Sequence, residues 1–227
     1  MPSFDIIKEN CADKNSFRVQ SVIGMFDLDS EHTKEHFTGN IELPEEWNVG
    51  VIVGASGTGK TTIMRELFSD YVVENNEYNH KSVIDDMPKE KTVKEITQAF
   101  NSVGFSSPPS WLKPYAVLSN GEKMRVDLAN GILSNKDIIV FDEFTSVVNR
   151  EVAKIGSYAI QKSIRKQNKK FIAVSCHYDI IDWLEPDWVF CTDDMSFQIS
   201  KKKDQKFEYL STNVTGLYGK CLENIII

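Results

Sequence analysis

The motif G-x-x-x-x-G-K-[ST] occurs as Gly54-Ala55-Ser56-Gly57-Thr58-Gly59-Lys60-Thr61, followed directly by Thr62. An apolar run at 49–53 precedes it and apolar side chains repeat every four residues over 62–68, so we expect a strand, a loop and a helix. The glycines let backbone N–H groups turn inward on an anion, and the helix N-terminus adds positive charge. The motif therefore predicts that Gly54 to Thr62 bind nucleotide phosphates, with Lys60 on the outer phosphates and Thr61 on Mg²⁺. The alternative, a glycine-rich turn with an unrelated lysine, fits the flanks less well.

Length and composition limit the class of protein. The 227 residues suffice for one domain with an ample core, and we expect 1–227 to form a single domain. No run approaches the roughly 18 apolar residues of a membrane span, and the start shows no secretory signal, so we expect a soluble, cytoplasmic protein. The net charge of −7 argues against broad nucleic-acid binding but leaves room for a local basic patch. Four cysteines without C-x-x-C spacing indicate free thiols.

Strand patterns dominate the residues before the motif. The stretches 16–23 and 36–43 alternate β-branched and aromatic side chains with polar ones, which predicts an antiparallel β layer over 1–48. After the motif, 82–84 is a brief apolar run that ends in Asp85 and Asp86. We interpret it as a core strand that delivers these carboxylates to the sheet edge where ligands gather. A turn that uses Asp before Met-Pro is an equally good interpretation.

Two helix starts are marked by capping signals. Thr92 and Glu95 form a capping box ahead of an amphipathic stretch that Gly104 closes. Leu118-Ser119-Asn120-Gly121-Glu122 heads a second helix, whose apolar stripe is Met124, Leu128, Ile132 and Leu133. A serine and a glycine at a helix start can form an anion site, although taken alone this is only a capped helix.

Two further apolar runs end in polar side chains. The run 137–141 leads to Asp142 and Glu143, a pattern in which one carboxylate holds Mg²⁺ and the next polarises water. The run 171–176 ends at His177, and a lone histidine is usually structural. Each signal is weak on its own.

The order of these motifs resembles the ABC-type ATPases over nearly the whole chain. Gly54 to Thr61 resembles the Walker A loop, Leu118 to Glu122 the signature motif, Ile138 to Glu143 the Walker B strand, and His177 the switch histidine. The chain is also similar to the ABC ATPases fused to a predicted acetyltransferase, which have counterparts of 141–148 and 174–179. The resemblance implies a P-loop NTPase of ABC type, an α/β fold with a mostly parallel core sheet flanked by helices. Its nucleotide-binding core would be 49–81 and 134–227, beside the N-terminal antiparallel β layer and a short helical lobe at 82–133.

The resemblance also implies roles by position. Lys60 and Gly59 would hold phosphates, Thr61 and Asp142 would hold Mg²⁺, Glu143 would activate the attacking water, and His177 would contact the γ-phosphate. Ser119, Asn120 and Gly121 would act in trans on the nucleotide of a second copy. An aromatic side chain upstream of the loop stacks on adenine in the family, and Phe26 is our candidate, with Phe37 second.

The sequence departs from the family at several positions. Asn120 stands where glycine is usual, which we expect to be tolerated because Asn accepts positive φ. Asn149 stands where the family's D-loop carries aspartate, and Asp85 or Asp86 would have to replace the Q-loop glutamine. Only 58 residues lie between Lys60 and Ser119, fewer than transporter subunits use for a membrane-docking lobe.

Three functions agree with these patterns. The first is an ATPase that hydrolyses ATP, forms an ATP-dependent homodimer, head to tail over two Mg-ATP, and acts on a soluble protein or a nucleic acid. The second is the ATP-binding subunit of a membrane ABC transporter, which the short lobe disfavours. The third is a nucleotide-gated scaffold in which Asn120 and Asn149 make hydrolysis slow or absent.

Overall fold

The computed structural model describes residues 3–9, 16–27, 34–73 and 77–200. Its centre is a 5-stranded sheet in the order β4-β5-β3-β6-β7. Neighbouring strands among β4, β5, β3 and β6 run parallel, and β7 pairs antiparallel to β6 at one edge. The strands are β3 (Val49–Val53), β4 (Ile138–Phe141), β5 (Lys170–Ser175), β6 (Trp188–Cys191) and β7 (Ser196–Ile199). The prediction of a mostly parallel core sheet is confirmed.

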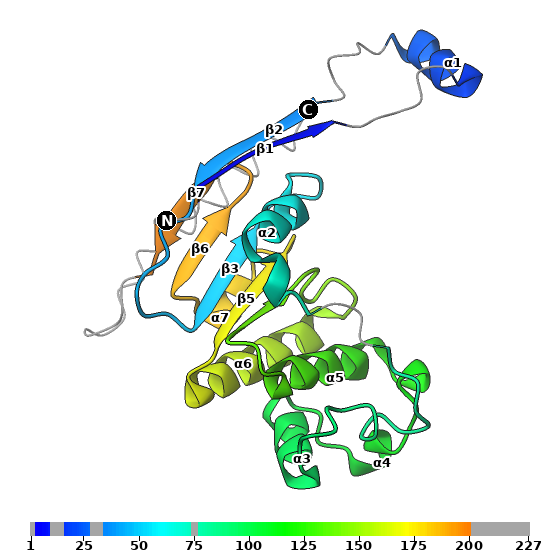
Figure 1. Ribbon diagram of the computed structural model, residues 1–227, viewed down its shortest axis with the longest axis vertical. Coiled ribbons are helices and arrows are strands. Elements are labelled where there is room, and N and C mark those ends of the chain that lie inside the picture. Colours follow the sequence, from blue (N-terminus) through cyan, green and yellow to red (C-terminus); the bar gives the residue numbers. More distant parts are fainter. Residues whose placement is uncertain (1–2, 10–15, 28–33, 74–76, 201–227) are drawn as a thin grey trace.

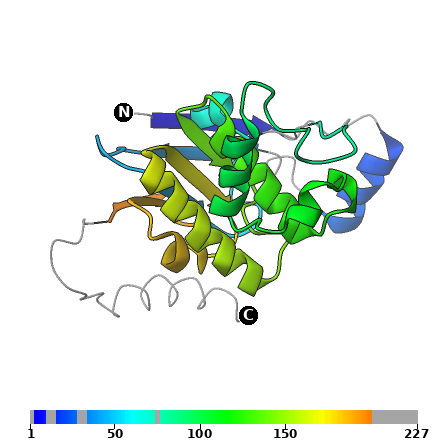
Figure 2. The ribbon, with the colours of Figure 1, turned by 90° about the horizontal axis from the view of Figure 1, so that it is seen from below.

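Side chains of the central strand β3 divide between two hydrophobic cores. Val49, Val51 and Val53 belong to one core, and Ile52 belongs to the other, as the period of two requires. Figures 1 and 2 show α5, α6 and α3 gathered on one side of the sheet, with α2 and the β1–β2 ribbon on the other. The helices are α2 (Lys60–Phe68), α3 (Val93–Ser102), α4 (Pro108–Trp111), α5 (Asn120–Leu133), α6 (Arg150–Gln167) and α7 (Ile180–Leu184). The 3₁₀ turns are η2 (Ser69–Tyr71) and η3 (Tyr115–Val117).

The N-terminal layer is antiparallel, as expected, but only in part. Strand β1 (Ser3–Glu9) pairs with β2 (Lys34–Asn40), and the ring of Phe4 packs edge-on against Phe190 of β6. The strand predicted at 16–23 is wrong, because these residues lie in helix α1 (Phe17–Phe26). Apolar residues at 19, 22, 23 and 26 repeat with helical spacing, and this period competes with the apparent alternation.

The core strand predicted at 82–84 is also wrong, and the turn alternative is confirmed. Val83 and Ile84 donate their backbone N–H groups to the carbonyls of Lys113 and Trp111, in a segment without strands. Asp86 Oδ1 accepts the N–H groups of Asn79 and His80, each at 3.0 Å. Short carboxylate side chains compete for backbone donors and so favour turns over ladders. Asp85 and Asp86 therefore do not follow a strand, and a role for either in place of the Q-loop glutamine stays a prediction.

Both helix caps exist as predicted. The hydroxyl of Thr92 accepts the N–H of Glu95, whose carboxylate accepts the N–H of Thr92, and Gly104 follows α3 at φ 80°. Ser119 and Glu122 form the same reciprocal pair at the start of α5. Such boxes satisfy backbone donors that the first helical turn leaves without partners.

Candidate nucleotide site

The backbone of the loop between β3 and α2 depends on its glycines. Gly57 and Gly59 have φ of 87° and 85°, in the left-handed region that other residues adopt at a cost. A side chain at Gly59 would also meet the ring of Phe37 at 2.6 Å, and one at Gly54 would meet Oγ1 of Thr192 at 2.0 Å. The loop is thus closely packed against β2 on one side and the end of β6 on the other.

Lys60 and Thr61 begin helix α2 and point to different partners. Lys60 is only 8% exposed, and its Nζ donates a 2.6 Å hydrogen bond to the carbonyl oxygen of Ala55. Thr61 Oγ1 donates to Oδ2 of Asp142 at 3.0 Å. Parallel strands end at one edge of the sheet, so the residue after β4 meets the first turn of α2 there. The structure therefore brings together the two residues predicted to hold Mg²⁺.

The other predicted loop residues lie around this pair. Thr58 donates from Oγ1 to the carbonyl oxygen of Ala55 at 2.9 Å and lies 2.5 Å from Oγ1 of Thr192. Ala55 and Ser56 are exposed, and Thr62 is half-buried on the first turn of α2. The loop thus exposes Ala55 and Ser56 to solvent and is held to the end of β6 by the contact between Thr58 and Thr192.

The acidic pair after β4 lies in a tight turn. Glu143 has φ 52° and Thr145 has φ 69°, two left-handed conformations outside glycine within three residues. Such conformations cost of order 1–3 kcal/mol each and gather at functional sites. The N–H of Glu143 donates to Oδ1 of Asp142 at 2.9 Å, and Ser146 donates to Oε2 of Glu143 at 2.6 Å. Both carboxylates are thereby held in fixed orientations.

His177 follows β5 and is connected to the same turn. Its backbone N–H donates to Oγ of Ser175 at 3.1 Å, and Ser175 Oγ in turn donates to the carbonyl oxygen of Phe144 at 2.9 Å. The imidazole is half-buried. His177 therefore shares the edge of the sheet with Lys60, Asp142 and Glu143.

Sequence reasoning missed the contribution of β6. Asp193 Oδ1 accepts the N–H of Ala55 at 2.8 Å, and its other oxygen accepts the hydroxyl of Tyr178. A carboxylate is thus bonded to a loop N–H group that the motif assigns to phosphate. The signal was an apolar run followed by Thr192 and Asp193, similar to the run before Asp142.

The predicted signature residues lie on a different element from the loop. Ser119 and Asn120 are exposed at the start of α5, and a side chain at Gly121 would meet Val152 of α6 at 3.0 Å. Among the described residues no hydrogen bond or ion pair joins the three to the loop. Asn120 is the first residue of the helix and has no positive φ, so the conformational reason given for tolerating it was wrong.

The two aromatic candidates for adenine lie in different places. Phe37 is buried beside Gly59, whereas Phe26 is 70% exposed on α1. Figure 1 shows α1 beyond the far end of the β1–β2 ribbon, away from β3. Asn149, at the D-loop position, caps α6 by accepting the N–H of Val152 at 2.9 Å. Stacking by Phe26 stays a prediction.

The oxygen atoms of the site suit Mg²⁺. A threonine hydroxyl and a carboxylate are hard oxygen ligands, and Mg²⁺ is usually bound by one or two such groups plus substrate phosphates. No cluster of three or more His, Cys, Asp and Glu side chains able to hold a metal occurs in the described part of the chain. The site therefore fits a metal that arrives with a phosphate ligand.

Comparisons with known proteins agree with the geometry. No protein-family model matches the chain. It is 28% identical over 200 residues to the mRNA export factor elf1 of Schizosaccharomyces pombe, covering 78% of this chain and 18% of that protein. A probable metal transport system ATP-binding protein of Thermotoga maritima is 28% identical over 159 residues, covering 60% of this chain and 65% of the relative. The chain thus spans less than two thirds of either relative.

Solved structures show the same fold. A dimeric ATP-binding cassette in a post-hydrolysis state, bound to ADP and phosphate, superposes with a TM-score of 0.60 at 12% identity, over 88% of this chain and 98% of that one. At this identity the likeness concerns the fold alone. Among the described residues no helix has the length and apolar character needed to cross a bilayer. The chain is thus similar to ABC-type ATPases in the order of its motifs, and its fold is that of the ATP-binding cassettes.

Proposed function

We propose that the protein binds Mg-ATP at the β3–α2 loop and hydrolyses it to ADP and phosphate. The observation that supports this most strongly is the 3.0 Å contact of Thr61 with Asp142, directly beside Lys60 and Glu143. Loop N–H groups and Lys60 bind and orient the phosphates. Glu143 takes a proton from the attacking water, and His177 positions the terminal phosphate. Bound Mg²⁺ would supply charge neutralisation between the outer phosphates, held by Thr61 and Asp142.

ATP turnover of two glutamate variants, compared with that of the wild type, tests this proposal. Glu143→Gln keeps the shape and one acceptor oxygen but cannot take a proton, so turnover should fall by roughly 10²- to 10⁴-fold while Mg-ATP affinity persists. The control is Glu151→Gln, an exposed glutamate in the first turn of α6, which should retain turnover. Equal turnover in the wild type and Glu143→Gln would refute the assigned base, and absent turnover in the wild type with normal binding would favour the scaffold.

The site also requires a second copy of the chain. Ser119 and Asn120 are exposed and Gly121 is half-buried at the start of α5, on a different element from the loop, and the family's geometry would place all three on the nucleotide of a partner, head to tail. Glu143→Gln protein should be monomeric without nucleotide and dimeric with Mg-ATP in light scattering. Adding Ser119→Arg should abolish the dimer, whereas Ser106→Arg, an exposed serine in the same lobe, should not. An unchanged mass in every condition would contradict a composite site.

A transporter subunit is the second candidate. The energy-coupling factor transporter ATP-binding protein EcfA1 of Staphylococcus aureus is 23% identical over 78% of both chains. We favour a cytoplasmic protein that acts on a soluble protein or a nucleic acid, because the lobe before Ser119 is short. Purification of Glu143→Gln protein from its own cells in detergent decides the matter. Stoichiometric recovery of a polytopic membrane protein would establish the transporter.

A further inference from the structure

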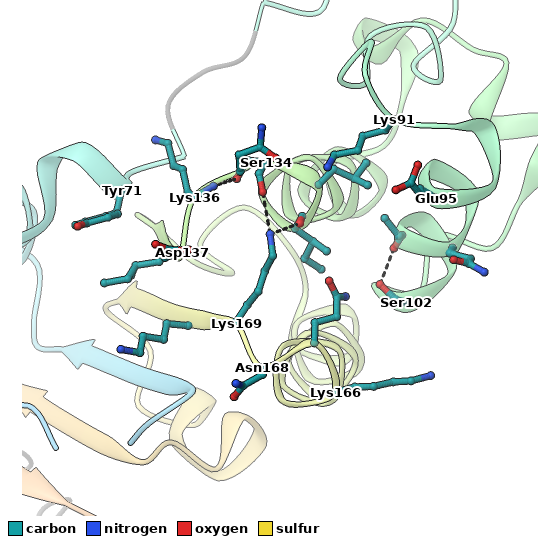
Figure 3. Close-up of a pocket in the computed structure, with 18 of the residues that line it drawn as sticks. Tyr71, Lys91, Glu95, Ser102, Ser134, Lys136, Asp137, Lys166, Asn168 and Lys169 are labelled. Carbon is teal, nitrogen blue, oxygen red and sulfur yellow. Dashed lines mark hydrogen bonds between the residues drawn. The ribbon is translucent and has the colours of Figure 1, made fainter. Parts of the chain in front are cut away.

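A large cavity lined by described residues lies at the opposite edge of the sheet from the candidate nucleotide site. It has a volume of about 1310 Å³ and is bounded by the starts of β4 and β5, the ends of α5 and α6, and one side of α3. Figure 3 shows side chains that line it. A volume above the roughly 300–1,000 Å³ of small-molecule pockets indicates an extended ligand.

The lining of this cavity is basic in a chain of net charge −7. Five lysines face two carboxylates, which leaves three positive charges. One carboxylate, Glu95, is already engaged: it accepts hydrogen bonds from the backbone and hydroxyl of Thr92 at 2.8 and 2.7 Å. The lysines are Lys91, Lys136, Lys166, Lys169 and Lys170, and the second carboxylate is Asp137.

Three of the lysines have partners within the protein. Lys169 donates to the carbonyl oxygens of Ile132 and Ser134 at the end of α5, at 2.6 and 2.8 Å. Lys136 donates to the carbonyl of Val72, and Lys170 lies over the ring of Trp47. In the described residues no ion pair engages Lys91 or Lys166, which line different walls. These two cations are the ones available to a ligand.

The cations also crowd one another. Burial lowers the pKa of Lys169, and the positive charge of Lys91 lowers it further, while the negative charge of Asp137 acts in the opposite direction. An anion between the two ammonium groups would replace this repulsion with attraction. Hydroxyl and amide side chains surround them, and these groups together with lysine make most protein contacts to phosphate and sugar. They are Gln98, Asn101, Ser102, Ser134, Asn135, Gln167 and Asn168.

We propose that this cavity binds the phosphate backbone of single-stranded nucleic acid, with Lys91 and Lys166 each contacting a different phosphate. Ammonium and amide side chains can contact the backbone of a flexible single strand. Among the described lining residues Tyr71 is the one aromatic side chain on which a base could stack, so we expect binding to be insensitive to base sequence. This proposal depends on one part of the proposed function, namely that the partner is a nucleic acid. Since the cavity lies apart from the Thr61–Asp142 edge, it is tested without nucleotide, and its failure leaves ATP hydrolysis untouched.

The experiment measures fluorescence anisotropy of a labelled 15-nucleotide oligo(U) RNA against salt concentration, with the full chain. The double variant Lys91→Gln/Lys166→Gln should bind more weakly, and the slope of log affinity against log salt should shrink by about 1.4, or roughly 0.7 per lost phosphate contact. The matched control is Lys94→Gln/Lys162→Gln, which removes the same charge from exposed positions of α3 and α6 outside the cavity. The control should retain both affinity and slope.

Several results would overturn the proposal: no binding by the wild type at low salt, equal losses in both double variants, tighter binding of a duplex, or competition by polyglutamate as strong as by RNA. A second measurement needs no variant. Chemical acetylation of the wild-type lysines, read by mass spectrometry, should slow at Lys91 and Lys166 when RNA is added and stay constant at Lys94 and Lys162. Protection spread evenly over the four would count against the cavity.

Discussion

The hydroxyl of Thr61 donates a 3.0 Å hydrogen bond to Oδ2 of Asp142, and this contact joins positions 81 residues apart. It connects the first turn of α2 to the end of β4, across the intervening β5, because β4 is two strands away from β3 in the sheet. The Thr61 hydroxyl and the Asp142 carboxylate therefore lie together at the start of α2, directly after the loop. The fold thus brings together the two residues proposed to hold Mg²⁺, which no local sequence pattern connects.

Replacing Lys60 by Ala should weaken ATP binding by more than about tenfold, because a hydrogen bond to a charged group contributes about 1.5–3 kcal/mol. Calorimetric titration with Mg-ATP measures the change. Lys154→Ala, at an exposed lysine of α6, is the control and should bind normally. Undiminished affinity in Lys60→Ala would contradict the phosphate loop.

Replacing Thr61 by Val removes the hydroxyl and preserves the shape of the side chain. The wild type should bind ATP more tightly with Mg²⁺ than without it, and the variant should lose most of this difference because one of two protein ligands is gone. The measurement is ATP affinity in Mg²⁺ and in chelator. Thr97→Val, at a half-buried position of α3, controls for loss of a helix hydroxyl. An equal Mg²⁺ effect in Thr61→Val would exclude the assigned ligand.

Asn149 allows stability and turnover to be separated. Asn and Asp are comparable N-caps, so Asn149→Asp should leave the free energy of unfolding nearly unchanged, whereas Asn149→Ala should lower it by about 1 kcal/mol. We expect Asn149→Asp, which restores the aspartate usual in the family, to raise turnover. Urea unfolding and ATPase assays on both proteins provide the comparison. A large stability loss in the Asp variant would contradict the cap.

Asp127 predicts a pH dependence of stability. Burial raises the pKa of its carboxyl, although hydrogen bonds from Tyr78 and Tyr115 at 2.6 and 2.7 Å act in the opposite direction. A raised folded-state pKa means that the native protein binds the proton more tightly, so this group's contribution is favourable at low pH and diminishes as pH rises above about 3.9.

The variant Asp127→Asn cannot ionise and tests this sign. Its free energy of unfolding minus that of the wild type should become more positive between pH 4 and 7, as measured by urea unfolding. Asp182→Asn, on α7, serves as a comparison for the loss of a carboxylate elsewhere. A difference that falls over this range would mean that the tyrosine hydrogen bonds outweigh burial.

Sequence patterns predicted the parts of the fold whose signals are local. The loop at Gly54 to Thr61, the boxes at Thr92 and Ser119, and the strands that end at Asp142 and His177 all depend on short-range chemistry. The errors arose where a short apolar run fitted two periods, at 16–23, or where an aspartate could either end a strand or bond its own backbone, at 82–86. Asp193 was missed because its role depends on β6 lying next to β3, which no sequence period encodes.

Ser175 is 1% exposed, and its hydroxyl bridges the carbonyl of Phe144 and the N–H of His177. A second bond, from the N–H of Phe144 to the carbonyl of Val174 at 2.8 Å, runs alongside it. The turn that carries Glu143 and the turn that carries His177 are consequently one rigid unit. A displacement of Glu143 away from α2 would therefore carry His177 with it unless these two hydrogen bonds break.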